Sequence, residues 1–176
     1  MHIFSILTAA LATVASVTAS TIGRRDAYTL ISDFKTLADR TGDMSTALDE
    51  FTGSPPSIQP LEAATSSIIT LFQQITANID ALPMLDPSQS RQILSALQNE
   101  AAIAQGFFNK LVAKHTLVAA IHQESIIVSV IHQFQDYSTR AFAVLTPKMN
   151  GLDSTLMGMA QATLEEALER ALTTYM

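Results

Sequence analysis

The chain has 176 residues, a formal net charge of −6, hydrophobic residues at 48% of positions and no cysteine. A chain of this length forms one domain with a single core, and its acidic balance argues against nucleic acid or anionic membranes as partners. Without cysteine there are no disulfides, no thiolate catalysis and no cysteine-ligated zinc, so apolar packing must stabilise the fold.

The first nineteen residues have the pattern of a cleaved signal peptide. They contain no Lys, Arg, Asp or Glu, and serine and threonine interrupt their apolar run. The run is too short for a transmembrane helix, which needs about 20 consecutive apolar residues. Small residues precede the expected cleavage site after Ala19, although His2 stands where a basic residue is usual. A membrane anchor or a first core helix is the alternative.

Two amphipathic helices are predicted next. Between residues 27 and 51 apolar side chains recur at three- and four-residue spacing, while charged residues occupy the other faces. The stretch 52–56 breaks this period with a glycine and two prolines, after which Ser57 is expected to cap a second helix. That helix should run to Leu82 and stop before Pro83, because proline disfavours helix in the residue before it.

A third helix should begin with Asp86 as its cap, Pro87 as its first residue and Gln89 reaching back to the cap. From residue 88 to residue 146 there is no proline and a single glycine, so the sequence does not mark where the third helix gives way to a fourth. One continuous helix of that length would be about 90 Å long, too long for a domain of this size. We therefore place the break at residues 114–119.

The fourth and fifth helices complete the predicted fold. The fourth should end at Thr146–Pro147, and the fifth should run from Asn150–Gly151 to the last residues. Residues 126–131 (IIVSVI) are apolar on all sides and would favour a strand in isolation, but the helical period continues on both sides of them. We therefore predict that the fourth helix is the most buried one, surrounded by the others. The expected fold class is all-α, a single-domain bundle of about five amphipathic helices over residues 26–176, after a cleaved signal peptide.

No pattern in the sequence indicates catalysis or metal binding. Spacings of seven and ten residues separate His115, His122 and His132, so two imidazoles do not share adjacent turns as in a metal-binding i, i+4 pair. There is no Gly-x-Ser-x-Gly elbow and no glycine-rich phosphate loop. The acidic residues are expected at solvated positions on the helix faces. We therefore predict a protein that is not an enzyme and has no catalytic residue, metal or cofactor.

Several features together resemble the fungal hydrophobic surface-binding protein A family, which includes the cell-wall galactomannoproteins. They are the short leader, the junction 24–27 (RRDA), the segments 93–97 (ILSAL) and 111–114 (LVAK), and the absence of cysteine. The resemblance covers essentially the whole chain after the leader and implies an all-α bundle secreted by a filamentous fungus. It also marks Arg24 and Arg25 as a processing site, so that residues 20–25 form a short pro-segment and the mature chain begins at Asp26.

The family implies two activities. Some members adsorb to hydrophobic solids and help recruit polyester- or cutin-degrading hydrolases, whereas the mannoproteins enclose fatty acids in a cavity between helices. The expected partners are therefore fatty acids or hydrophobic solid surfaces, with a secreted esterase or cutinase as a further partner, and neither nucleic acid nor a stable membrane span is expected. The expected location is extracellular, with at most a loose association with the cell wall, because the sequence shows no Ser/Thr-rich stalk and hydrophobic tail at residue 176.

The candidate cavity positions are apolar residues near the middle of their helices. Burying apolar area contributes roughly 25 cal/mol per Å², so the inward stripes of the bundle are its expected binding surface. The candidates are Phe34, Leu37, Phe72, Ile75, Phe107, Leu111, Ile131 and Phe134. The sequence leaves open whether they line a void or fill it. The alternative function is a secreted interaction or effector-like protein that acts through its exposed helix faces.

Overall fold

The first long helix, α2 (Ala27–Glu50), has the length and period that the sequence predicts. A computed structural model of the chain describes residues 27–176, so the predicted signal peptide, its cleavage at Ala19 and the Arg24–Arg25 site lie outside the described residues. One face of α2 is buried and includes Leu30, Phe34, Leu37, Met44 and Leu48. Because these positions follow the helical period, the sequence alone was sufficient to place this helix.

The link to the next helix differs from the prediction at Ser57. A 3-10 turn, η1 (Pro55–Ile58), precedes α3 (Gln59–Ala81), and the cap position of α3 is occupied by Ile58 without a side-chain hydrogen bond. Ser57 does not cap α3, because its Oγ donates to the carbonyl of Ser54 at 2.7 Å. The prediction of a Ser57 cap was therefore wrong, since the two prolines favour a separate turn before the helix begins.

The third predicted helix begins where the sequence indicates. α4 (Pro87–Ala113) starts with a capping box in which the Asp86 carboxylate accepts hydrogen bonds from the backbone N–H groups of Ser88 and Gln89, at 2.8 and 2.9 Å. The Gln89 Oε1 in turn accepts from the backbone N–H of Asp86 at 3.2 Å. Both halves of the reciprocal cap are present, so the prediction for this helix start is confirmed.

The break between the third and fourth predicted helices lies at the expected place. α4 ends at Ala113, a single turn α5 (His115–Ala119) follows, and α6 (Glu124–Leu145) begins after it. His122 has a φ of 53°, in the left-handed region that completes the reversal of the chain. A short 3-10 turn η2 (Thr146–Lys148) then leads to α7 (Gly151–Tyr175).

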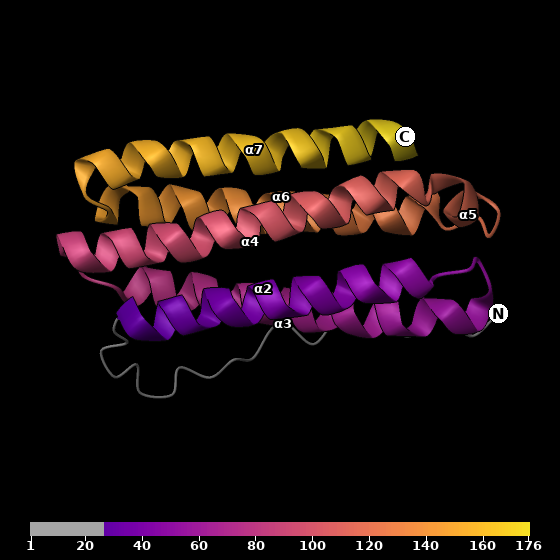
Figure 1. Cartoon of the computed structure of the whole chain (residues 1–176), viewed down its shortest axis with the longest axis horizontal. Coiled ribbons are helices and arrows are strands. Elements are labelled where there is room, and N and C mark those ends of the chain that lie inside the picture. Colours follow the sequence, from indigo (N-terminus) through magenta and orange to yellow (C-terminus); the bar gives the residue numbers. More distant parts are fainter. Residues whose placement is uncertain (1–26) are drawn as a thin grey trace.

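The five long helices form a closed ring around a common axis (Figure 1). Around the ring the order is α2, α3, α6, α7 and α4, so that α4 lies between α2 and α7 while α6 lies between α3 and α7. Every regular element among residues 27–176 is helical, which confirms the all-α class. In this arrangement the core is the interior of the ring, and each helix keeps an outward face.

The prediction that the fourth helix is the most buried one was wrong. In the run 126–131 only Ile131 is buried, Ser129 is exposed and the other residues are half-buried. The physical reason is the ring, in which no helix is surrounded by all the others. The run packs on the core with its inner side only, and most of its β-branched residues are partly exposed on the outer surface.

Two lysines close the carboxyl ends of α2 and α3. The Lys114 Nζ donates to the carbonyls of Asp49 and Phe51, each at 3.1 Å. The Lys148 Nζ donates to the carbonyls of Ile79, Asp80 and Leu82 at 2.7, 3.0 and 2.7 Å. A cation at a helix carboxyl end satisfies unpaired carbonyls and complements the helix dipole, so each ammonium stabilises one end of the ring.

Candidate ligand-binding cavity

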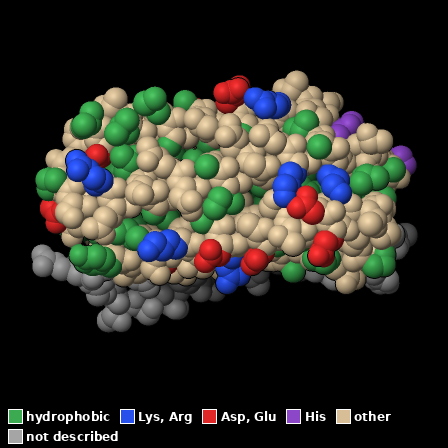
Figure 2. Space-filling model, viewed as in Figure 1, with side chains coloured by type: hydrophobic (Ala, Val, Ile, Leu, Met, Phe, Trp, Pro, Cys, Tyr) green, Lys and Arg blue, Asp and Glu red, His purple; other side chains and the backbone are tan. Residues whose placement is uncertain are grey.

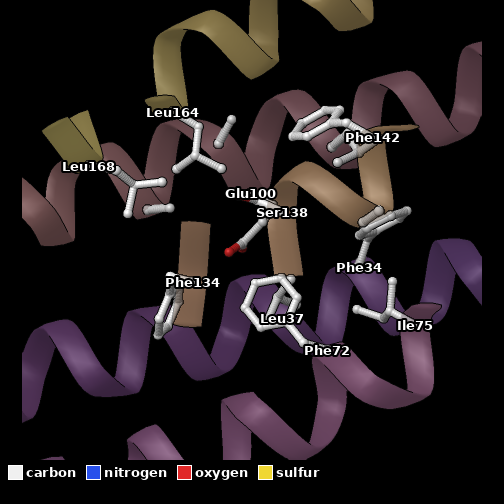
Figure 3. Close-up of a pocket in the computed structure, with 14 residues that line it drawn as sticks. Phe34, Leu37, Phe72, Ile75, Glu100, Phe134, Ser138, Phe142, Leu164 and Leu168 are labelled. Atoms are coloured by element: carbon white, nitrogen blue, oxygen red, sulfur yellow. The ribbon is translucent and has the colours of Figure 1, made fainter. Parts of the chain in front are cut away.

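A small cavity lies inside the ring, and all five long helices contribute to its wall (Figure 3). Its volume is about 30 Å³, which is room for about one water molecule. The wall consists of Phe34 and Leu37 of α2, Phe72 and Ile75 of α3, Leu97, Glu100, Ala101 and Ala104 of α4, Phe134, Ser138, Ala141 and Phe142 of α6, and Leu164 and Leu168 of α7. Alanines on α4 and α6 leave this space open, since they fill less volume than the larger apolar residues around them.

Aromatic rings form one side of the cavity. Phe72 meets Phe134 edge-to-face with ring centroids 5.4 Å apart, and it stacks on Tyr137 at 5.7 Å. Phe134 also meets Phe108 edge-to-face at 5.6 Å. Pairs of this kind contribute about 0.5 to 1.5 kcal/mol each beyond the area that they bury, so this side joins α3, α4 and α6 firmly.

One acidic residue, Glu100 of α4, lies within this apolar wall. It is only 6% exposed, and Figure 3 shows its carboxyl pointing into the space between the apolar side chains of the other helices. Its Oε1 lies 3.0 Å from Thr41 Oγ1, whereas its Oε2 is buried without a hydrogen-bond partner. Burial raises the pKa of Glu100 to about 8, and the hydrogen bond with Thr41 opposes this rise.

The single proton of the Thr41 hydroxyl has two acceptors within reach, the carbonyl of Leu37 at 2.9 Å and Glu100 Oε1 at 3.0 Å. When Glu100 is ionised, Thr41 can donate to Oε1, which is why this hydrogen bond opposes the rise in pKa. When Glu100 is protonated, Thr41 can donate to Leu37 and accept the O–H of Oε1, which leaves Oε2 as a free acceptor. Burial favours the protonated form at neutral pH.

Five of the eight candidate positions meet at the cavity. They come from three helices, α2, α3 and α6, and all of them line it: Phe34, Leu37, Phe72, Ile75 and Phe134. Their role in ligand binding stays a prediction, but the structure brings them together around one space.

The other three candidates lie elsewhere in the core. Phe107, Leu111 and Ile131 are buried but take no part in the cavity wall. Phe107 packs edge-to-face against Phe108, and the carbonyl of Leu111 accepts a hydrogen bond from the Tyr175 hydroxyl at 2.7 Å. These positions fill the part of the ring toward the α5 end.

Sequence reasoning missed Glu100, because all acidic residues were expected at solvated positions. That expectation was wrong for Asp33, Glu100 and Asp153, which are 7%, 6% and 5% exposed. A signal was present for Glu100, since it continues the apolar stripe of Ile93 and Leu97 at helical spacing. An ionisable residue on an inward stripe is a functional candidate. Asp33 is paired differently, with the side-chain amides of Gln74 and Asn78.

No group of three or more His, Asp or Glu residues within 27–176 is arranged to hold a metal ion. None of the helices from α2 to α7 is long and apolar enough to cross a membrane.

Comparison with known proteins identifies the family. The family model described as hydrophobic surface binding protein A (HsbA) matches residues 27–146. The chain belongs to this family. The resemblance inferred from the sequence is thereby confirmed over α2 to α6, the helices that supply most of the cavity wall. No curated protein sequence matches the chain.

Solved structures share the fold of this HsbA protein. AFMP4P, crystallised in complex with palmitic acid, has a TM-score of 0.83 and 20% identity over 86% of this chain and 100% of that chain. Domain 1 of the Penicillium marneffei MP1 protein, complexed with arachidonic acids, has a TM-score of 0.77 and 9% identity over 82% and 95% of the two chains. Domain 2 of MP1, also in complex with arachidonic acids, gives a TM-score of 0.74 and 10% identity over 91% and 97%. At these identities the likeness establishes the shared helical fold.

Proposed function

We propose that this HsbA protein is a secreted, non-catalytic binder of fatty acids and related lipids, which it takes into the interior of its helix ring. The observation that carries the proposal is the cavity, because all five long helices present apolar side chains to one small space. Solved proteins of the same fold are complexed with palmitic acid and with arachidonic acids, which supports this assignment.

Lipid binding requires the ring to expand. The cavity holds about 30 Å³, whereas pockets for small-molecule ligands usually hold about 300 to 1,000 Å³. Burial of an acyl chain contributes about 0.8 kcal/mol per methylene, so about fourteen methylenes supply roughly 11 kcal/mol before costs are subtracted. That gross gain is large enough to offset a partial separation of helices, which makes an opening ring energetically reasonable.

The outer surface favours a binding site in the interior of the ring over a permanent apolar patch on the surface. Figure 2 shows hydrophobic side chains scattered over the face in view among polar and charged ones. Exposed large hydrophobic side chains among residues 27–176 are Tyr28, Met84, Leu152, Met159 and Met176. Single exposed apolar residues are ordinary for a soluble protein, so adsorption to a hydrophobic solid would also draw on the interior stripes.

Native mass spectrometry of the secreted protein tests lipid binding. We expect bound lipid to copurify, and we expect the delipidated protein to melt at a higher temperature when a fatty acid is added back, because a ligand that binds only the folded state stabilises it. A protein that instead leaves solution onto polystyrene without binding lipid would be a surface binder. Absence of both effects would refute the proposal and favour an interaction protein.

The same mass measurement tests the proposed processing. We propose cleavage near Ala19 and then after Arg25, with an extracellular mature chain that is at most loosely associated with the cell wall. A mass corresponding to a start at Asp26 is expected. Recruitment of a secreted esterase or cutinase is a further part of the proposal, and it requires that the protein accelerate polyester hydrolysis by such an enzyme while hydrolysing no ester by itself.

A further inference from the structure

The cavity contains an acceptor that the protein leaves unused. Glu100 Oε2 is buried without a hydrogen-bond partner, although more than 90% of buried polar groups in proteins have one. The carboxyl is directed into the cavity and away from solvent (Figure 3). An unpaired buried oxygen at the wall of an apolar space is an incomplete site, and its chemistry defines what would complete it.

The surrounding side chains offer no donor to this oxygen. The acceptors of the Thr41 hydroxyl are the carbonyl of Leu37 and Glu100 Oε1, and the Ser138 hydroxyl donates to the carbonyl of Gln135 at 3.0 Å. All other wall residues end in hydrocarbon. A donor for Glu100 Oε2 must therefore enter with the occupant of the cavity.

We propose that Glu100 is the head-group site of this cavity, where Oε2 accepts a hydrogen bond from the neutral hydroxyl of a lipid, either a long-chain alcohol or a fatty acid in its protonated form. The inference rests on the proposed function, because the acyl chain must be able to enter the ring. The apolar wall then contacts the chain, and Glu100 selects the end of the molecule that carries the O–H group.

Charged head groups fit this site poorly. The wall residues contributed by α2, α3, α6 and α7 are Phe, Leu, Ile, Ala and Ser, so Glu100 is the only titratable group in the wall, and no cation is available to pair with a carboxylate. A fatty acid anion would place its lone pairs against those of Oε2. The anion enters only after it has taken up a proton. The O–H of the fatty acid then donates to Glu100 Oε2, and the O–H of Glu100 donates to Thr41.

The two sources of the hydroxyl respond differently to pH. An alcohol keeps its proton, so its binding should be constant until Glu100 itself ionises, and the pKa of Glu100 is raised to about 8. A fatty acid must be protonated, so its affinity should fall about tenfold for each pH unit above its own pKa. Binding of an alkane, which has no head group, should not depend on pH.

The experiment uses the delipidated, secreted protein and three probes of equal chain length, dodecan-1-ol, dodecanoic acid and dodecane. We expect the wild-type protein to bind the alcohol about tenfold more tightly than the alkane, the value of one net hydrogen bond. Glu100→Leu should abolish this preference without weakening alkane binding. Glu100→Gln should keep it within about threefold, because the amide can donate to Thr41 and accept from the alcohol. Glu169→Gln, at an exposed position on α7, is the matched control and should bind as the wild type does.

Each outcome separates the inference from the proposed function. If no probe binds to any protein, the proposed function fails and the inference fails with it. If the alkane and the alcohol bind equally to the wild type, or if Glu100→Leu keeps the preference, lipid binding stands and the head-group site is refuted. Should Glu100→Leu not fold, the wild type and Glu100→Gln decide the matter. Alcohol binding must strengthen above about pH 8 in the wild type, where the ionised carboxylate is the stronger acceptor, and stay constant in Glu100→Gln.

Discussion

The ends of the ring and its centre satisfy their polar groups in opposite ways. At the ends, Lys148 donates to three carbonyls at the α3 end, Lys114 donates to two carbonyls at the α2 end, and Asp86 caps α4 with a reciprocal partner. At the centre, Glu100 keeps one buried oxygen without a partner beside an unfilled space. The ends therefore fix the arrangement of the helices, whereas the centre is complete only with an additional molecule.

The largest effect should come from Glu100→Gln, which removes the titrating group and keeps its shape. The carboxyl has a pKa of 4.5 in ordinary surroundings and about 8 when folded, so between these values the folded chain binds more protons than the unfolded chain. The wild-type free energy of unfolding therefore falls as the pH rises from about 4.5 to about 8. At 1.36 kcal/mol per pKa unit this loss is about 4 to 5 kcal/mol. Urea titrations should show equal stabilities near pH 4 and a more stable variant near pH 9.

The difference between the two proteins is the informative quantity, because other carboxyl groups titrate in both. Glu169→Gln changes an exposed carboxyl on α7 in the same way and should leave the profile unchanged. If the wild type were as stable as Glu100→Gln near pH 9, the centre of the ring would accommodate a charged Glu100. The centre would then satisfy its polar groups as the ends do.

Phe134→Ala should destabilise the centre by about 3 to 4 kcal/mol, within the usual range for loss of a buried phenylalanine. Phe134 meets both Phe72 and Phe108 edge-to-face, so its removal breaks the aromatic side of the cavity. The denaturant midpoint should fall with an unchanged m-value. Leu152→Ala, at a position that is 72% exposed, is the control and should shift stability by less than about 0.5 kcal/mol. If Phe134→Ala also raises the melting shift given by dodecanoic acid, the enlarged space is accessible to lipid.

Lys148→Met should cost about 1 to 2 kcal/mol, because three carbonyls at the α3 end lose their charged donor but can turn to water. Lys35→Met removes an exposed lysine of α2 and serves as the control. Hydrogen exchange should show the loss as faster opening of the last turn of α3. Equal costs for the two variants would contradict the view that the ends are held by these ammonium groups.

The smallest effect is expected from Asp86→Ala, about 1 kcal/mol for the loss of the cap of α4. Asp86→Asn retains an acceptor oxygen for the backbone N–H groups of Ser88 and Gln89 and should lose only a fraction of that. Thermal denaturation of the two variants at matched concentration measures the difference. If Asp86→Asn lost as much stability as Asp86→Ala, the stabilisation would come from the charge of Asp86 and not from its capping hydrogen bonds.

The helices could be predicted from the sequence because their determinants are local. The apolar period of α2 and the Asp86–Gln89 box act within one helix, and both predictions are confirmed. Five of the eight cavity candidates meet at one space, because residues on inward stripes near helix centres converge on the axis of a bundle. The period of a helix shows which of its faces points inward, and this information is sufficient to place those five residues at the cavity.

The rest depends on how helices are arranged, which local pattern does not encode. The run 126–131 suggested a central helix, but a ring of five has no central position, and the run is only half-buried. Phe107 and Leu111 lie on the correct stripe of α4 but at a level nearer the α5 end, and the level of the cavity is fixed by contacts between distant helices. Glu100 was assigned to solvent by residue type, although its position in the period pointed inward.

The ring has only two connections between neighbours in sequence, the α2–α3 and α6–α7 hairpins, and α4 joins them. Helices α3 and α6 face each other with no covalent link, and along this seam Gln73 Nε2 donates to the Tyr137 hydroxyl at 3.1 Å. Lys148 crosses the same seam at one end only, from the turn after α6 to the carbonyls that end α3. The α3–α6 seam is therefore closed by side-chain contacts alone, with the Phe72 ring against Phe134 and Tyr137 along its length and the Lys148 ammonium at one end.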